Sequence, residues 1–221
     1  MPLHFLVLGG TGAIGTLFTH KALAEGHRLT LYARNPSKLS DSLRAQEKLD
    51  VIEGELSDMV ALKTAAKCGA DAFISCAGPL SGSQGTPQPI TDCYAKLLPL
   101  LASNGVHRAI MLCTPSFSQP EDSFSLLWSF GRVFMRLLHF TEFNEMVSVG
   151  ELVTLRSPAD MTWTLFRVGG LTDGAEKDTT ATMLGSGKDH VTISRESVAA
   201  WLLKEIKDSQ WKLKAPYICN T

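Results

Sequence analysis

Residues 5–15 read FLVLGGTGAIG, an apolar run that leads directly into a glycine-rich loop. The run is typical of a buried strand, and the apolar residues that follow Gly15 recur at helical spacing until Gly26. The loop matches G-x-G-x-x-G between a strand and a helix, which is the context that this motif requires. Its glycines allow a tight turn, a close approach of the backbone to a pyrophosphate, and close packing of helix on strand. We predict a dinucleotide-binding loop; the alternative is a glycine-rich turn that binds nothing.

Strand and helix patterns alternate after this loop. Further strands are expected at 29–33, 51–53, 72–75 and 109–113, with helices at 59–67 and 90–102 and a short helix after Pro36. Such alternation forces a mostly parallel sheet with helices on both faces, so the predicted fold class is α/β, a doubly wound Rossmann sheet. The turn-rich stretches 78–89 and 114–123 each follow a strand, and we expect both at the carboxyl edge of the sheet, where ligands bind.

The pattern changes after Ser123. Residues 124–149 are rich in aromatic side chains and are predicted to be helical. Beyond them we expect strands at 162–167 and 190–193, a helix from 194 to about 207, and a final edge strand at 217–219. No linker separates the two halves, so we predict one NAD(P)-binding Rossmann domain over 1–221, with 114–160 as an insertion on the substrate side.

The composition is that of an ordinary globular chain, with 221 residues, 44% apolar and 19% charged side chains, and a net charge of −1. This balance argues against nucleic acid and against a polybasic membrane anchor. The most apolar stretch, 124–140, is too short to span a bilayer and is interrupted by Arg132 and Arg136. We therefore expect a small-molecule substrate, no nucleic acid or membrane as partner, and a monomer or homodimer.

The cysteines and histidines carry no sign of cross-links or metal ligation. There are five cysteines, an odd number, and no pair has C-x-x-C spacing. The six histidines are not spaced as metal ligands. We predict a reduced, cytoplasmic protein without a disulfide framework or a metal site.

Arg34 follows the second expected strand, at the position where many NAD-binding proteins carry an acidic residue that binds the ribose 2′-hydroxyl. A guanidinium suits a 2′-phosphate instead. The sequence therefore favours NADP (NADPH) as cofactor, with Lys38 as a second cation. The alternative is that Arg34 is an ordinary solvated arginine.

The chain resembles the NAD(P)H-binding group of the atypical short-chain dehydrogenase/reductase superfamily, which includes NmrA-like proteins and biliverdin reductase B (flavin reductase). The segments that carry the likeness are 9–15, 33–39, 54–58, 75–79, 113–117, 166–172 and 193–199. The resemblance implies that Leu56 lies near the adenine, and that the ends of the fourth, fifth and sixth strands line the rest of the cofactor. Together with the glycine loop and Arg34, the predicted cofactor-binding residues are Gly9, Gly10, Thr11, Gly12, Ala13, Ile14, Gly15, Arg34, Leu56, Cys76, Ala77, Gly78, Cys113, Val168 and Gly169.

One feature of the wider superfamily is missing from this chain. Many members use a Tyr-x-x-x-Lys pair, in which the lysine lowers the pKa of a proton-donating tyrosine. None of the three tyrosines here, Tyr32, Tyr94 and Tyr217, has a lysine four residues later. Carbonyl reduction by that route is therefore not expected. The absence is compatible with flavin- or biliverdin-type reductases, and with a protein that has lost catalysis.

A proton donor would have to come from other side chains. Thr114 and Ser116 follow the fifth strand, where members of the superfamily often keep a hydroxyl; the alternative is that these hydroxyls cap the loop. His139 and Glu151 lie further along the chain, and a glutamate in a dry pocket can have a raised pKa. The alternative for Glu151 is a solvated helix face. These four residues are the predicted catalytic candidates.

The aromatic segment offers candidates for a substrate pocket. Phe117, Phe124 and Trp128 could stack on a flat aromatic substrate. Neighbouring side chains recur at helical spacing and are predicted to belong to the core, namely Leu127, Phe130, Phe134 and Leu138. A hydrophobic lid or a dimer face is a further interpretation of the segment.

Three functions fit these observations. The first, which we favour, is an NADPH-dependent reductase of a small conjugated or aromatic acceptor, such as a flavin or a quinone. The second is a non-redox isomerase or dehydratase on the same scaffold. The third is a non-catalytic NADP-binding regulator that resembles NmrA-like proteins. The glycine loop supports all three, and fold alone does not choose among them.

Overall fold

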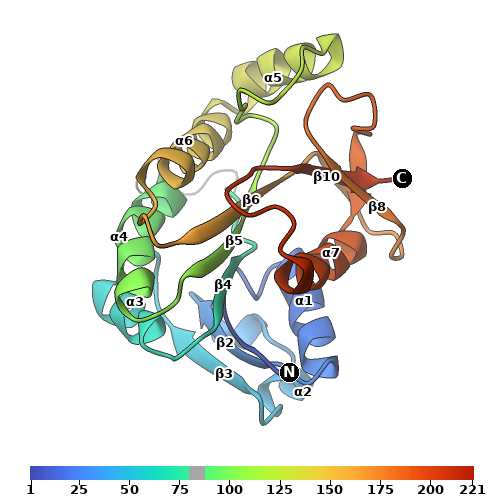
Figure 1. The fold of residues 1–221 in the computed structure, drawn as a ribbon. Coiled ribbons are helices and arrows are strands. Elements are labelled where there is room, and N and C mark those ends of the chain that lie inside the picture. The colour runs from blue at the N-terminus through green and yellow to red at the C-terminus, as the bar shows by residue number, and fades with distance from the viewer. Residues whose placement is uncertain (80–87) are drawn as a thin grey trace.

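The computed structural model describes residues 1–79 and 88–221 and centres on an eight-stranded sheet with the order β3-β2-β1-β4-β5-β6-β10-β8 (Figure 1). The strands are β1 (His4–Leu8), β2 (Arg28–Ala33), β3 (Leu49–Glu53), β4 (Ala72–Ser75), β5 (Arg108–Cys113), β6 (Thr162–Val168), β7 (Gly170–Thr172), β8 (Thr179–Thr182), β9 (Thr192–Ser194) and β10 (Tyr217–Asn220). The helices are α1 (Ala13–Ala24), η1 (Pro36–Lys38), α2 (Asp41–Arg44), α3 (Met59–Ala66), α4 (Pro89–Ser103), α5 (Leu126–Leu138), α6 (Phe140–Arg156) and α7 (Arg195–Asp208).

The sheet is wound in two directions from its centre. The chain runs outward from β1 through β2 to β3, then returns to the other side of β1 and continues through β4, β5 and β6, all parallel. Helices α1 and α7 pack together on one face, and α3, α4 and α6 lie on the other (Figure 1). The prediction of a doubly wound, mostly parallel Rossmann fold is confirmed.

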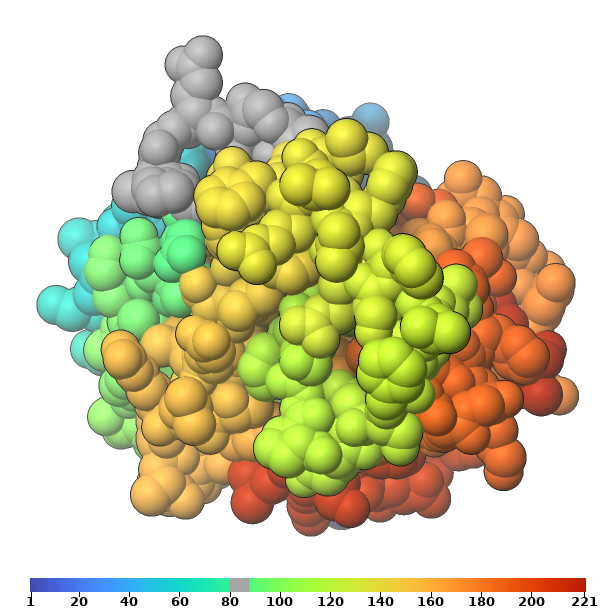
Figure 2. Space-filling view, turned by 90° about the horizontal axis from the view of Figure 1, so that it is seen from above, coloured from blue at the N-terminus to red at the C-terminus, as the bar shows by residue number. Residues whose placement is uncertain are grey.

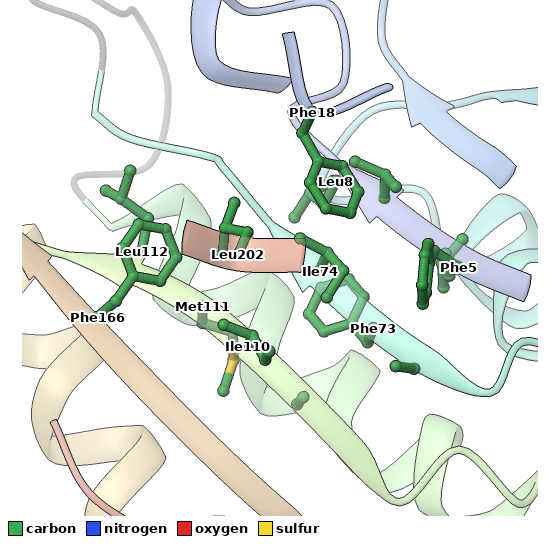
Figure 3. Packing of buried hydrophobic residues seen from close by; sticks show 14 of the residues in the cluster. Phe5, Leu8, Phe18, Phe73, Ile74, Ile110, Met111, Leu112, Phe166 and Leu202 are labelled. Atoms are coloured by element: carbon green, nitrogen blue, oxygen red, sulfur yellow. The ribbon is translucent and has the colours of Figure 1, made fainter. Parts of the chain in front are cut away.

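The central strands are buried on both faces because helices cover both sides of the sheet. Every residue of β4 is buried, as are the last four of β1 and the last five of β5. Figure 3 shows Phe18 of α1 and Leu202 of α7 beside the side chains of these strands. The rings of Phe5 and Phe18 lie 5.9 Å apart, so the first strand and first helix share a core contact.

Two short strands have no counterpart among the expected elements. Strand β7 has three residues, and β8 has the sequence TTAT, which offers no apolar alternation to detect. Because β8 pairs antiparallel with β10, it takes the edge position that we expected for residues 217–219. The expectation of an edge strand there is wrong: β10 lies inside the sheet, between β6 and β8.

The predicted helical segment 124–149 divides into two helices at His139. Helix α6 buries Phe143, Met146, Val149 and Val153 and packs beside α4, so it belongs to the helical layer of the fold. Helix α5 has no buried residue.

The prediction that the apolar side chains of α5 belong to the core is wrong. Phe130 is 73% exposed and Phe134 is 61% exposed, and Leu127 and Leu138 are exposed as well. The helical spacing is present, but the face that it creates points away from the sheet.

A buried ion pair joins the sheet to the loop after β5. Arg167, near the carboxyl end of β6, has a fully buried side chain whose two terminal nitrogens bind the Asp122 carboxylate at 2.5 and 2.7 Å. The same carboxylate accepts hydrogen bonds from the backbone N–H groups of Gln119 and Leu184. Asp122 therefore fixes the loop 114–123 against both β6 and the segment that follows β8.

We predict that Asp122→Ala lowers the free energy of unfolding by about 3–5 kcal/mol, because it leaves the Arg167 charge buried without its partner. Chemical denaturation measures this loss. Asp50→Ala is the matched control, since Asp50 pairs with Arg28 at 2.7 Å on the surface, and its loss should be below about 1 kcal/mol. Equal losses of unfolding free energy in the two variants would show that the buried ion pair stabilises the fold no more than the surface pair does.

Candidate functional site

The glycine loop lies where the chain reverses its winding direction, at the gap between the carboxyl ends of β1 and β4. Gly9 has a φ of +78°, and a Cβ atom there would come within 2.8 Å of the Ala77 backbone nitrogen, just after β4. A Cβ atom at Gly15 would overlap the Gly9 carbonyl oxygen. The ends of two strands and the first turn of α1 therefore meet backbone to backbone, with no room for a side chain.

The first turn of α1 points toward this gap, and no side chain of residues 1–79 or 88–221 caps its N–H groups. Gly12 is the N-cap residue, and the first turn holds no acidic residue. The first N–H groups of any helix lack intrahelical acceptors and carry a partial positive charge. Thr11 is half-buried, and Gly12 and Ala13 are exposed, whereas Ile14 is buried and can offer only its backbone. This arrangement suits an anion such as a pyrophosphate.

Arg34 lies beside this loop, immediately after β2, the neighbour of β1 in the sheet. Its side chain is exposed and has no ion-pair or hydrogen-bond partner within residues 1–79 and 88–221. Asn35 accepts a hydrogen bond from the Ser37 N–H and so caps η1, which carries Lys38. The turn is thus held by Asn35, and the guanidinium remains available for a ligand.

The remaining predicted cofactor residues follow the same edge of the sheet. Ala77 and its neighbours Cys76 and Gly78 lie just beyond β4, where the Cys76 N–H donates to the Leu8 carbonyl at 2.9 Å. Leu56 is partly buried after β3. Cys113 ends β5, Val168 ends β6, and Gly169 lies between β6 and β7. The fold brings all of these positions to one edge, and their cofactor contacts stay predictions. Part of the turn-rich stretch 78–89, residues 80–87, lies outside the described residues.

The three tyrosines are all engaged in hydrogen bonds to the protein. The hydroxyl of Tyr32 donates to the Glu55 carbonyl at 2.6 Å, that of Tyr94 to Ser75 Oγ at 2.7 Å, and that of Tyr217 to the His190 carbonyl at 2.7 Å. Burial raises the pKa of each phenol above its ordinary value. None is therefore an easily ionised proton donor.

The Cys113 thiol, at the end of β5, is equally unreactive. Cys113 is buried and its thiol donates to the Met146 carbonyl. Burial raises the pKa of the Cys113 thiol to about 12, so it is protonated at neutral pH and is a weak nucleophile. All five cysteines are free thiols. In the described part of the chain, no group of three or more His, Cys, Asp or Glu side chains is placed to hold a metal ion.

The four catalytic candidates fall into two groups. Thr114 and Ser116 directly follow β5 at the carboxyl edge, Thr114 half-buried and Ser116 buried. Thr114 Oγ1 accepts a hydrogen bond from the Ser116 N–H at 3.4 Å, as the loop-capping alternative expects. His139, at the junction of α5 and α6, and Glu151, on α6, are both exposed to solvent. Their catalytic roles stay predictions.

The three aromatic candidates for a substrate pocket differ in their surroundings, and their role in binding a substrate stays a prediction. Phe117 is buried with its ring against Gly150 of α6, where a Cβ atom would overlap the ring. Phe124 is 82% exposed. The Trp128 indole N–H donates to the Asp189 carboxylate at 2.6 Å, and its ring meets Tyr217 edge-on at 4.9 Å.

One buried carboxylate lies outside the four catalytic candidates. Glu145 of α6 is 1% exposed, and its Oε1 accepts hydrogen bonds from the Ile90 and Thr91 N–H groups at the start of α4. Its Oε2 has no partner among the described residues. Burial, opposed by these hydrogen bonds, raises the pKa of the carboxyl. A solvated helix face is the ordinary expectation for a glutamate of this segment, and the sequence does not reveal the burial of Glu145, because its donors lie more than fifty positions away along the chain.

A family model described as NAD(P)H-binding matches residues 9–209 of the chain, from the glycine loop to the end of α7. The protein belongs to this NAD(P)H-binding family. The family resemblance stated from the sequence is thereby confirmed. A comparison with curated protein sequences found no match. In the described residues, no helix combines the length and the apolar character needed to cross a membrane.

Several solved structures share the fold at low sequence identity. A short-chain dehydrogenase/reductase from Veillonella parvula, in complex with NADP, is 18% identical with a TM-score of 0.78, covering 100% of this chain and 95% of its own. An anaerobillin reductase from Escherichia coli O157:H7 is 17% identical with a TM-score of 0.77, and the match covers 98% of this chain and 97% of that one. A putative NAD-dependent epimerase/dehydratase from Bacillus halodurans is 19% identical with a TM-score of 0.77, and the match covers 99% of this chain and 94% of that one. At these identities the likeness shows the fold alone.

We predict that Gly15→Ala weakens NADPH binding by about tenfold or more and lowers Tm, because its Cβ atom forces the glycine loop away from α1. Fluorescence titration and thermal unfolding measure the two effects. Gly131→Ala in α5 is the matched control, since a Cβ atom there meets nothing within 4 Å. Unchanged NADPH affinity in Gly15→Ala would show that the loop does not hold the cofactor.

Proposed function

We propose that the protein is an NADPH-dependent reductase of a small conjugated or aromatic acceptor, such as a flavin or a quinone. The observation that carries this proposal is the N-terminus of α1, uncapped within the described residues, between β1 and β4, together with Arg34 after the neighbouring strand β2, whose guanidinium has no partner among the same residues. Membership of the NAD(P)H-binding family supports the cofactor class. The choice of NADPH over NADH rests on Arg34.

The residues present fit a dinucleotide. The close contact of Gly9 with Ala77 leaves backbone, and not side chains, around the α1 N-terminus, so a pyrophosphate can approach its N–H groups. Arg34, with Lys38 behind it, would bind the 2′-phosphate through charge-assisted hydrogen bonds. The backbone at Cys113, Val168 and Gly169 would hold the nicotinamide end. When bound, the cofactor supplies a hydride.

The acceptor class follows from the proton donors that the chain offers. A ketone needs a positioned acid, yet all three tyrosines are hydrogen-bonded and have raised pKa values. A conjugated ring spreads the negative charge that hydride addition creates, so it needs little help from the protein. The hydroxyls of Thr114 and Ser116, at the end of β5, would orient such a ring by hydrogen bonding. His139 and Glu151, both in solvent, are weaker candidates for this role.

We predict that Arg34→Ala weakens NADPH binding roughly 10- to 100-fold, the value of a charge-assisted hydrogen-bonded contact, and leaves NADH binding nearly unchanged. Fluorescence titration of both cofactors tests this. Arg28→Ala is the matched control, because it removes the same charge from the opposite end of the same strand. Equal losses for NADPH and NADH in Arg34→Ala would contradict the assignment of Arg34 to the 2′-phosphate.

We also predict that the protein consumes NADPH when FMN or a soluble quinone is added, with one acceptor reduced for each NADPH oxidised, and that Gly15→Ala consumes it more slowly when NADPH is below saturation. Absorbance of NADPH follows the reaction. Tight NADPH binding without oxidation by any acceptor would contradict the reductase and favour the regulator. Conversion of a substrate without net loss of NADPH would favour an isomerase or dehydratase.

A further inference from the structure

One side of α5 is turned toward the rest of the protein. Within this helix Trp128, Gly131 and Arg132 are half-buried, and every other residue is exposed. The three lie three and four positions apart, so they share one side of the helix, here called the inner side of α5. Figure 2 shows α5, in yellow-green, between α6 and the orange segment that follows β8. The inner side of α5 thus offers one large aromatic ring and one cation.

Trp128 connects the inner side of α5 to the nicotinamide end of the predicted cofactor site. A Cβ atom at Gly169 would lie 3.5 Å from Cη2 of the Trp128 indole. Gly169 directly follows β6 and is one of the residues that would hold the nicotinamide end. The indole is fixed there, because its N–H donates to the Asp189 carboxylate at 2.6 Å and its ring meets Tyr217 edge-on. A flat ring that approaches the nicotinamide from this side would therefore meet Trp128.

Arg132 is a half-buried cation that the protein itself does not neutralise. Its guanidinium forms no hydrogen bond or ion pair within the described part of the chain. The Asp189 carboxylate, which holds this side of the helix, is already bound by the Trp128 indole and by the N–H groups of Gly185 and Gly187. A guanidinium that is partly removed from water and left unpaired favours an anionic ligand.

Room for a ligand remains beside these two side chains. A Cβ atom at Gly131 would meet no atom of another segment within 4 Å, although Gly131 is itself half-buried. Gly131 lies between Trp128 and Arg132 on the same side of the helix. The inner side of α5 is therefore covered by the protein without being packed against it at this point.

We propose that the acceptor of this reductase carries an anionic group, such as a phosphate, a sulfonate or a carboxylate, which binds Arg132 while the flat ring of the acceptor lies against Trp128. The inference rests on the proposed function, because it concerns the second substrate of that reaction. Arginine presents planar donors that match the oxygens of such groups, and these charge-assisted hydrogen bonds are stronger than neutral ones. A neutral acceptor would leave the guanidinium unpaired, so Arg132 selects between acceptors that share the same ring.

FMN and riboflavin test the proposal, because they share one ring system and differ by a single phosphate. At saturating NADPH, we expect Arg132→Gln to lower kcat/KM for FMN roughly tenfold or more, the value of a charge-assisted hydrogen bond, and to leave kcat/KM for riboflavin nearly unchanged. Absorbance of NADPH follows both reactions. Arg136→Gln is the matched control, since it removes the same charge one turn further along α5, where the side chain is exposed. It should behave as the unaltered chain does with both flavins.

The ring contact is tested with the same two flavins. Trp128→Ala should lower kcat/KM for FMN and for riboflavin by a similar factor, roughly three- to tenfold, because both present the same ring to the indole. Trp128→Phe keeps an aromatic ring but loses the N–H donor, and it should restore part of the loss. Thermal unfolding verifies that every variant is folded.

The outcomes separate this inference from the reaction on which it rests. Turnover of both flavins with equal losses in Arg132→Gln, or with no loss, would overturn the role of Arg132 and leave the reductase standing. If the unaltered chain oxidises no NADPH, the reductase fails and binding decides. FMN fluorescence, titrated with NADP-saturated protein, should then still show an affinity roughly tenfold weaker in Arg132→Gln. Equal FMN affinity in the two proteins, or no binding of FMN, would overturn the inference as well.

Discussion

The contact between Gly9 and the backbone after β4 is the constraint on which the rest of this structure depends. In a doubly wound sheet, β1 and β4 are neighbours in space but their connections leave in opposite directions, which opens a gap at their carboxyl ends. Here the gap is lined by backbone, because any Cβ atom at Gly9 would collide with Ala77. Gly15 lets α1 approach the same point. The position of the helix N-terminus, and so of any bound anion, follows from these close contacts.

Polar contacts fix the loops on the other half of the same edge. The Arg167–Asp122 pair ties the loop after β5 to the sheet, and the Asp122 carboxylate reaches the Leu184 N–H as well. The bond between Trp128 and Asp189 then attaches α5 to that region. Each of these is a buried or half-buried charge whose removal leaves its partner unsatisfied, so each specifies geometry more strongly than an apolar contact would. These polar contacts explain how α5, which has no buried residue, is held in one orientation.

The chemistry that the chain offers is limited mainly by burial. Its tyrosines and the Cys113 thiol are held neutral, and the Glu145 carboxyl is occupied in capping α4. Among the described residues, the carboxyl edge offers backbone, the hydroxyls of Thr114 and Ser116, and the Arg34 guanidinium, which has no partner among them. Such an edge favours reactions in which a cofactor supplies the reactive group and the protein supplies position. An acceptor that needs little acid catalysis suits such an edge.

The sequence by itself determined the alternation of strands and helices, the glycine loop and the place of Arg34. These are local signals: an apolar run followed by glycines, and one residue directly after a strand. Tertiary structure alone decided where β10 lies, what caps α4, and which way α5 faces. Glu145 acts on Ile90 and Thr91, and Trp128 on Asp189, across long stretches of chain. The apolar spacing of α5 reveals that one face of the helix is hydrophobic. That spacing is the same whether such a face packs on a core or lies on the surface. Only the attachment through Trp128 on the opposite side distinguishes the two.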